Sequence, residues 1–207
     1  MLSQQNRQTE KIRPDRRNAC PGLSRIVMAR DGAIARIKLK LGRLSADQAH
    51  SIAEIAERFG AGAIELSIRS NIQLRGIAPR HWNDAVAALQ AAGLGADNPG
   101  ADDIRNVMVS PTAGINRGQI CDVTGLASSV LDMLQANEAF YALSPKFSLQ
   151  IDGGEDCAMI SHPGDIWLSA IDGETFAFGL ASSPDREALG AVDAQHALPC
   201  LLYTSLM

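Results

Sequence analysis

The sequence predicts an α+β protein made of two successive units. Segments with the two-residue period of strands alternate with segments that have the 3.6-residue period of helices. A loop rich in Gly, Asp and Pro divides the chain near its middle. The 207 residues are 46% hydrophobic and 20% charged, a composition that can bury a core. We expect the first unit at residues 18–95 and the second at 96–197.

The first unit is predicted to run strand, helix, strand or hairpin, helix. In AIARIKLKLG, residues 33–42, apolar and cationic side chains alternate as in a half-buried strand. A helix follows in SADQAHSIAEIAERFG, with Ser45 as a candidate N-cap and Gly60 as the stop signal. A second helix is expected in PRHWNDAVAALQAAG, with Pro79 near its start and Gly93 beyond its end. This order is half of a ferredoxin-like α+β sandwich, in which helices cover one sheet face and the other stays open.

The stretch between the two helices, IELSIRSNIQLRGI, alternates apolar and polar residues. Its apolar residues are expected under the helices: Ile64, Leu66, Ile68, Ile72 and Leu74. Its polar residues then lie on the open face: Arg69, Asn71, Gln73 and Arg75. If the first strand pairs in the same sheet, it adds Arg36, Lys38 and Lys40 to that face.

The open face would therefore gather five cations and two amides, although the formal net charge of the chain is -4. Glu65 is the only acid in these strands, whereas ordinary surfaces mix both signs. Guanidinium forks and amide donors suit carboxylates or phosphates, so a polyanion is the expected ligand. A solvated face without a ligand is the alternative. Single-stranded nucleic acid usually requires stacking aromatic side chains, which this face lacks, and no nucleic-acid partner is expected.

The second unit begins at IRNVMVSPTAGI and continues with a helix around TGLASSVLDMLQAN. The segment YALSPKFSLQIDGG follows, and then the strands CAMISHP, DIWLSAID and TFAFGL, separated by Gly and Asp turns. These patterns predict a mixed α/β domain with an antiparallel sheet.

The two ends of the sequence have different characters. Residues 1–17 are polar and charged, and we expect a flexible leader. Residues 198–207, LPCLLYTSLM, follow no completed element, and we expect a non-native tail, at the end of a truncated sequence, that lies loose on the surface. No apolar run approaches the roughly 18 residues of a membrane span, and the N-terminus lacks the apolar core of a secretory signal. A cytoplasmic protein without a membrane partner is predicted.

The four cysteines are far apart, with no Cys-x-x-Cys pair and no histidine at the spacing of a zinc finger. A metal site built from local ligands is therefore not expected, and no metal ligand is assigned to Cys20, Cys121, Cys157 or Cys200.

From RRNACPGL to about Ala197, the sequence resembles the N-terminal half of the sirohaem-type nitrite and sulfite reductases. SIRSNIQLRGI is similar to the family's Thr-x-Arg-x-x-x-Gln-x-His-Gly-Ile segment, DDIRNVMVSPTAGI to its Arg-Asn-Val segment, and LSPKFSLQIDGG to its Leu-Pro-Arg-Lys-Phe segment. RNACPGL and the intact SPKF are most similar to the precorrin-3B synthase branch of this superfamily. The resemblance implies a ferredoxin-like half-domain at 18–95 and an incomplete first catalytic-type domain of the nitrite/sulfite reductases at 96–197.

The resemblance also implies residue roles. Arg69 and Gln73 would hold carboxylates of a tetrapyrrole, and Arg75 stands where the reductases place a histidine. Lys38 falls near a strand position that supplies a basic residue to the active site. The complete implied cofactor-binding set is Lys38, Arg69, Gln73, Arg75 and Asn106.

Two further residues are implied to be catalytic. Arg105 matches the arginine that faces the reacting anion, and Lys146 matches a lysine at the same place. The second lysine of the reductase pattern is Ser148 here, which weakens the cage of cations that a sulfite dianion requires. A sulfite reductase is therefore disfavoured. Because both implied catalytic cations must act where charge develops, we expect the side chains of Arg105 and Lys146 to point into one cavity.

The implied activity is that of an oxidoreductase of cobalamin biosynthesis, a monooxygenase that converts precorrin-3A to precorrin-3B with oxygen and forms a lactone. The implied cofactor is a [4Fe-4S] cluster with ligands in the missing C-terminal half, and sirohaem or another iron centre is also compatible. The implied partners are a polycarboxylate tetrapyrrole substrate and an electron donor, NADH or a ferredoxin system. The fragment is expected to be inactive alone. An assimilatory nitrite or sulfite reductase with sirohaem and a noncatalytic module that binds anionic tetrapyrroles are the alternatives.

Overall fold

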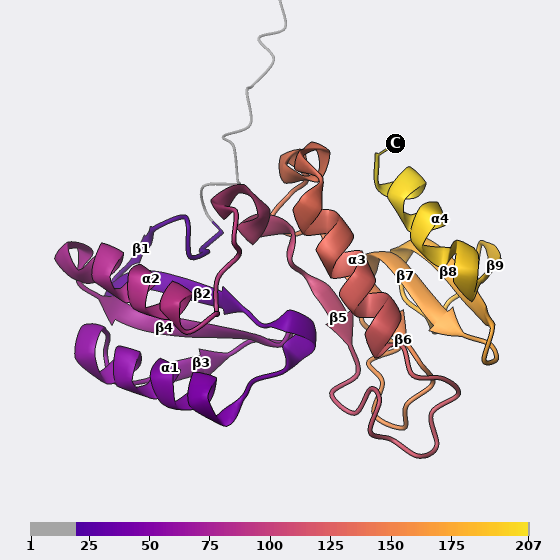
Figure 1. Ribbon diagram of the computed structural model, residues 1–207, viewed down its shortest axis with the longest axis horizontal. Coiled ribbons are helices and arrows are strands. Elements are labelled where there is room, and N and C mark those ends of the chain that lie inside the picture. The colour runs from indigo at the N-terminus through magenta and orange to yellow at the C-terminus, as the bar shows by residue number, and fades with distance from the viewer. Residues whose placement is uncertain (1–19, 207) are drawn as a thin grey trace, which may run out of the picture.

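The protein's structure, a computed structural model, describes residues 20–206 and the side chains as far as Leu201. Over this range the chain forms two units, each with its own sheet and hydrophobic core (Figure 1). The leader expected at residues 1–17 lies outside the described residues. No helix in the described range has the length and apolar character needed to cross a membrane.

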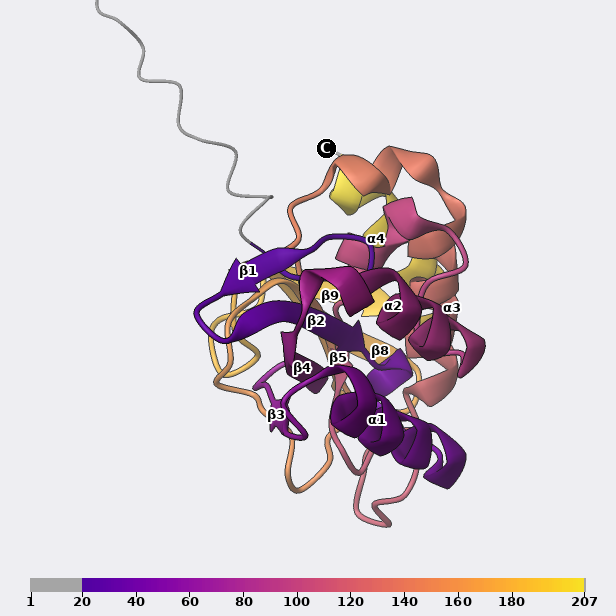
Figure 2. The same ribbon diagram turned by 90° about the vertical axis from the view of Figure 1, so that its left-hand side faces the viewer.

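The first unit has an antiparallel sheet in the order β1-β2-β4-β3, with two helices on one side of it (Figure 2). Its elements are β1 (Val27–Ala29), β2 (Gly32–Lys38), α1 (Ala46–Phe59), β3 (Ile64–Leu66), β4 (Asn71–Ile77), η3 (Pro79–His81) and α2 (Trp82–Ala91). The predicted order of strand, helix, hairpin and helix is confirmed, and β1 is an additional short strand.

The local signals of α1 act as predicted. The Ser45 side chain accepts a hydrogen bond from the Gln48 backbone, the Gln48 side chain accepts one from the Ser45 backbone, and Gly60 ends the helix. Ile52 and Ile55 are buried in the core between the helix and the sheet. The capping pair and the apolar stripe together fix the helix start and the face that packs on the sheet.

The β3–β4 hairpin corrects part of the burial prediction. Ile72 and Leu74 in β4 are 4% and 1% exposed, as predicted. Ile64, Leu66 and Ile68 are 48%, 80% and 77% exposed, so the prediction that they lie under the helices is wrong. The cause is position, because β3 is a three-residue edge strand at the margin of the sheet and Ile68 follows its end.

Lys40 does not lie on the open sheet face, which is a second correction. The strand β2 ends at Lys38, and the chain turns through η2 (Lys40–Gly42), where Leu41 has a φ of 53°. Lys40 instead lies 3.5 Å from Asp132 in an exposed ion pair. The turn also places Leu41 in the core of the second unit.

The second unit has a mixed five-stranded sheet in the order β5-β6-β7-β8-β9. β5, β6 and β7 are parallel, and β7, β8 and β9 are antiparallel. The prediction of an antiparallel sheet is therefore correct for β7 to β9 and wrong for β5 to β7. The elements are η4 (Pro99–Ile104), β5 (Val107–Val109), α3 (Thr124–Ala136), η5 (Glu138–Ala142), β6 (Leu149–Asp152), β7 (Gly164–Ala170), β8 (Thr175–Ser182), β9 (Gly190–Asp193) and α4 (Ala194–Leu206).

The segment CAMISHP, residues 157–163, is a connection and not the predicted strand. It joins β6 to β7, and because these strands are parallel, the chain must cross from one end of the sheet to the other between them. The apolar residues that suggested a strand are therefore in the crossover, where Met159 and Ile160 are exposed.

Residues at the start of the expected loose tail are packed. Ala197 and Leu201 on α4 are 0% and 2% exposed and belong to the second core, against which Leu198 also packs. Ala197 directly precedes the expected tail, and for Leu198 and Leu201 within it the expectation of a loose segment on the surface is wrong. The i, i+4 spacing of Ala197 and Leu201 puts both on one helical face, which is the face that meets the core.

Candidate functional site

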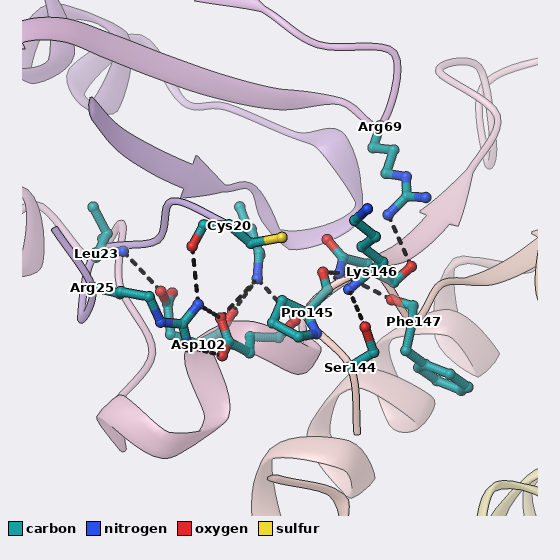
Figure 3. Close-up of polar contacts among 12 residues, drawn as sticks. Cys20, Leu23, Arg25, Arg69, Asp102, Ser144, Pro145, Lys146 and Phe147 are labelled. Carbon is teal, nitrogen blue, oxygen red and sulfur yellow. Dashed lines mark hydrogen bonds and ion pairs between the residues drawn. The ribbon is translucent and has the colours of Figure 1, made fainter. Parts of the chain in front are cut away.

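The second unit meets the open face of the first sheet at the end of β2, and we call this contact the seam. It is formed by β2 and the β3–β4 turn on one side and by η4 and the loop between η5 and β6 on the other (Figure 3). The Lys38 Nζ donates hydrogen bonds to the backbone carbonyls of Asp102 and Asp103, at 2.6 and 2.9 Å. This end of the open face is therefore an interface between the two units.

Lys38 is 3% exposed, and its ammonium group is occupied by protein atoms. Burial lowers the pKa of Lys38 to about 8, against the opposing charges of Asp102 and Asp103. The positive charges of Arg36 and Arg105 lower it further. Lys38 thus contributes charge to the seam, while its hydrogen bonds hold η4.

Arg105 follows η4 directly and is 8% exposed. Its Nε and Nη1 atoms are buried, and neither has a hydrogen-bond partner within the described residues. Burial lowers the pKa of Arg105 below its ordinary value, although the carboxylates of Asp102 and Asp97 act in the opposite direction. Buried guanidinium nitrogens without a partner are costly unless an anion pairs with them, so Arg105 is the strongest candidate for contact with an anionic ligand.

Arg36 on β2 adds a second guanidinium with an unsatisfied nitrogen. Its Nε atom is buried without a hydrogen-bond partner, again within the described residues. Burial lowers the pKa of Arg36, the nearby Cys20 thiol opposes this effect, and the positive charge of Arg69 adds to it. The electrostatic coupling between Arg36 and Arg69 and between Lys38 and Arg105 indicates that basic side chains from both units gather at the seam.

The structure brings the three sequence motifs together. Arg69 in the β3–β4 turn donates from Nη1 to the Lys146 carbonyl at 2.9 Å. The Asn106 Nδ2 donates to the carbonyls of Pro145 and Phe147, at 3.1 and 3.0 Å. Asn106 therefore fixes the loop that carries Lys146, which is an exposed residue. Arg105 and Lys146 lie on adjacent segments, and the convergence of their side chains in one cavity stays a prediction.

Gln73 and Arg75 lie farther along β4. Gln73 pairs in register with Arg36 on one side and with Glu65 on the other. Arg75 forms ion pairs with Asp31, at 3.0 Å, and with Glu65, at 3.4 Å. These carboxylates raise the pKa of Arg75, and the Arg75 guanidinium lowers the pKa of Asp31. The charge of Arg75 is thus balanced within the first unit, and its role toward a ligand stays a prediction.

Ser148 stands where the family pattern has its second lysine, and it is 1% exposed. Its backbone N–H donates to the Asp165 carboxylate at 2.8 Å, and its hydroxyl donates to the same oxygen at 3.3 Å. This pairing connects the residue before β6 to β7.

Asp102 and Asp103 are components of the seam that sequence analysis did not anticipate. The Asp102 carboxylate accepts a hydrogen bond from the Leu23 backbone at 2.8 Å, and the Asp103 carboxylate forms an ion pair with Arg25. The two acids directly precede the Arg105 motif, which is a weak signal. Their partners are 78 and 79 residues away, so the pairing has no local signature in the sequence.

The described residues differ in how well they suit the two cofactor types. No three His, Cys, Asp or Glu side chains gather as a metal-binding group in the part of the chain that the structure describes, so a [4Fe-4S] cluster does not fit there. A carboxylate-bearing ring fits the unpaired guanidinium of Arg105. A cavity of about 60 Å³ between the β3–β4 turn and β5 is lined by none of the basic residues of the seam. The seam itself supplies charges that suit a carboxylate-bearing ring.

Comparison with known families assigns both units. Residues 28–92 match the nitrite/sulfite reductase ferredoxin-like half domain, and residues 100–181 match the nitrite and sulphite reductase 4Fe-4S domain. The predicted fold class, a ferredoxin-like half-domain followed by a domain of this type, is confirmed.

This chain spans less than half of the length of the relatives described below, whereas the matched segments make up most of this chain. A precorrin-3B synthase from Sinorhizobium sp is 29% identical over 191 residues, which are 90% of this chain and 40% of the relative. A ferredoxin-nitrite reductase from Leptolyngbya laminosa is 34% identical over 136 residues, which are 63% of this chain and 27% of the relative. The structure of the NirA protein from Mycobacterium tuberculosis has the same fold, with a TM-score of 0.64 at 17% identity over 84% of this chain and 35% of that one.

Proposed function

This chain carries two domains of the nitrite/sulfite reductase family, and on that basis we propose that it forms one wall of the tetrapyrrole site of a precorrin-3B synthase. The observation that carries the proposal is the buried guanidinium of Arg105, whose Nε and Nη1 atoms lack a hydrogen-bond partner within the described residues and whose charge acts on Lys38. Carboxylates of the ring would supply the missing partners.

One observation favours a precorrin substrate over nitrite, and a second disfavours sulfite. The matching precorrin-3B synthase covers 90% of this chain, compared with 63% for the matching cyanobacterial nitrite reductase. Ser148 is committed to Asp165 in place of a second lysine, so the site has one cation fewer for a small dianion. A large substrate that carries several carboxylates depends less on that single charge.

In the proposed site the residues of this chain bind and orient the substrate. Arg69 and Gln73 would hold ring carboxylates at the β3–β4 side, and Arg105 would pair with a carboxylate from the η4 side. Asn106 keeps the Lys146 loop against η4 through its bonds to Pro145 and Phe147. A [4Fe-4S] cluster, held by residues outside the described part, would supply electrons from NADH or a ferredoxin system. The residues of this chain would then not carry out the reaction without that cluster.

A nitrite reductase with sirohaem is the second candidate. It is favoured by the 34% identity to the Leptolyngbya laminosa enzyme, which is higher than the 29% identity to the precorrin-3B synthase. The same basic seam would then face the carboxylates of sirohaem, and Arg105 and Lys146 would face the nitrite anion.

The two candidates are separated by assays of the full-length protein. In one reaction the protein receives precorrin-3A, oxygen and a reduced electron donor, and the product is analysed by mass spectrometry. In the other it receives nitrite and a reduced dye, and ammonium is measured. We expect the gain of one oxygen atom by the precorrin and no ammonium. Ammonium formation with unchanged precorrin would instead identify a nitrite reductase, and inactivity in both assays with retained ring binding would indicate a noncatalytic module.

A further inference from the structure

Four contacts converge on the two acids that precede Arg105. Asp102 accepts from the Leu23 backbone, Asp103 pairs with Arg25, and the carbonyls of both acids accept from Lys38 (Figure 3). These partners come from the segment before β1 and from the end of β2. The acids are 2% and 7% exposed. We call Arg25, Lys38, Asp102 and Asp103 the clamp.

From this arrangement we infer that Asp102 and Asp103 are positioning residues, which keep Arg105 buried, unpaired and available to the anionic ligand. The inference rests on the proposed function of the seam as a tetrapyrrole site. In this inference the clamp affects ligand binding only through the position of Arg105, and its own residues do not contact the ligand.

The clamp gives η4 support that the element lacks by itself. η4 is a six-residue 3₁₀ helix, and such short helices have poor hydrogen-bond geometry and depend on their surroundings. Arg105 is the residue that ends it. Without the clamp, the cost of burying an unpaired guanidinium would favour rotation of Arg105 toward water.

The clamp also provides partners for the carboxylates of both acids other than Arg105. Asp102 is the acid with the largest electrostatic effect on Arg105, yet one of its oxygens is bonded to the Leu23 backbone and the other has no hydrogen-bond partner within the described residues. Asp103 is engaged by Arg25. A freely rotating Asp102 would form an ion pair with Arg105 and close the anion site from within.

Gly22 offers an independent way to disturb the clamp. A Cβ atom at this position would lie 2.5 Å from the Oδ2 of Asp102, the oxygen that accepts from Leu23. Gly22→Ala should therefore displace the Asp102 carboxylate without changing any charge.

The test measures binding of uroporphyrin, a polycarboxylate porphyrin, to the full-length protein by fluorescence titration. The variants are Asp103→Asn, Gly22→Ala and Arg105→Met, and Asp132→Asn is the control because Asp132 is an exposed acid in another ion pair.

Removal of a negative charge would by itself strengthen the binding of an anion. The inference instead predicts weaker binding by Asp103→Asn. The affinity should fall about tenfold, because a displaced Arg105 would lose one charge-assisted contact with the ring. Gly22→Ala should weaken binding similarly, Asp103→Glu should retain affinity, and Asp132→Asn should have no effect.

A double variant shows whether the clamp acts through Arg105. If it does, Asp103→Asn should cause no further loss in the Arg105→Met background, because the positioned group is already absent. Equal losses in both backgrounds, or tighter binding by Asp103→Asn and unchanged binding by Gly22→Ala, would overturn the inference. If Asp103→Asn does not fold, the same comparison is made with Gly22→Ala in the wild-type and Arg105→Met backgrounds. Unchanged binding by Arg105→Met would instead contradict the proposed function itself.

Discussion

Arg69 donates a hydrogen bond of 2.9 Å to the backbone carbonyl of Lys146, a residue 77 positions away in the sequence. The contact joins the turn of the first sheet to the loop before β6, and Asn106 ties the same loop to the end of η4. Three motifs that are separate in the sequence thus meet along one seam.

Replacing Arg69 by Ala should weaken binding of a polycarboxylate tetrapyrrole by about 1.5–3 kcal/mol, because it removes a charge-assisted donor. Its effect on the urea midpoint should be small, since the side chain lies in a turn and makes a single described hydrogen bond. The matched variant Ile72→Ala should instead lower the free energy of unfolding by about 2–5 kcal/mol, because Ile72 is 4% exposed in the core. Ring titrations and urea unfolding of both variants check this division, and unchanged affinity in Arg69→Ala would contradict it.

Lys38 should make the stability of the protein depend on pH above neutrality. Its pKa is about 8 in the folded protein and 10.5 in a model peptide, so between these values the unfolded chain binds more protons than the folded one. The free energy of unfolding should therefore rise with pH across this window. The charged groups that act on Lys38 are Asp102, Asp103, Arg36 and Arg105.

Urea unfolding of the wild type and of Lys38→Met, at several pH values from about 7 to about 10.5, measures this contribution. The rise should be smaller in Lys38→Met and unchanged in the exposed control Lys40→Met. Identical slopes in the wild type and Lys38→Met would show that the lysine does not titrate in this window.

The burial of Leu201 predicts that α4 contributes to stability. Leu201→Ala should lower the free energy of unfolding by about 2–5 kcal/mol, since the side chain is 2% exposed in the second core. Leu189→Ala is the control, because Leu189 is 65% exposed and its truncation should change stability little. Equal midpoints for the two variants would contradict the packing of α4.

The parts of the fold that follow local rules were predictable from the sequence. Ser45 and Gly60 mark the ends of α1, and the alternation in β2 and β4 identifies the residues of both faces. The failures depend on position in the sheet. Ile64 and Leu66 have the pattern of buried residues, but their strand is at the edge, and no local pattern distinguishes an edge strand from a central one.

The site was predictable in its residue types and less so in its contacts. Basic residues on the open face and the three motifs pointed to an anion site. Lys38 looked like a ligand contact, but its ammonium group binds the carbonyls that precede Arg105. Arg75 looked available, but Asp31, 44 residues away, neutralises it. Such long-range pairs are set by tertiary structure, and a single sequence holds no record of them.

The central claim is that the seam binds a polycarboxylate ring through Arg105, and the affinity of the full-length protein for uroporphyrin tests it most directly. Arg105→Met should weaken binding by about 1.5–3 kcal/mol, which is roughly 10- to 150-fold, because a buried guanidinium loses its anionic partner. The same substitution at the exposed Arg58 should leave the affinity unchanged. Equal affinities of the wild type and Arg105→Met would contradict the claim.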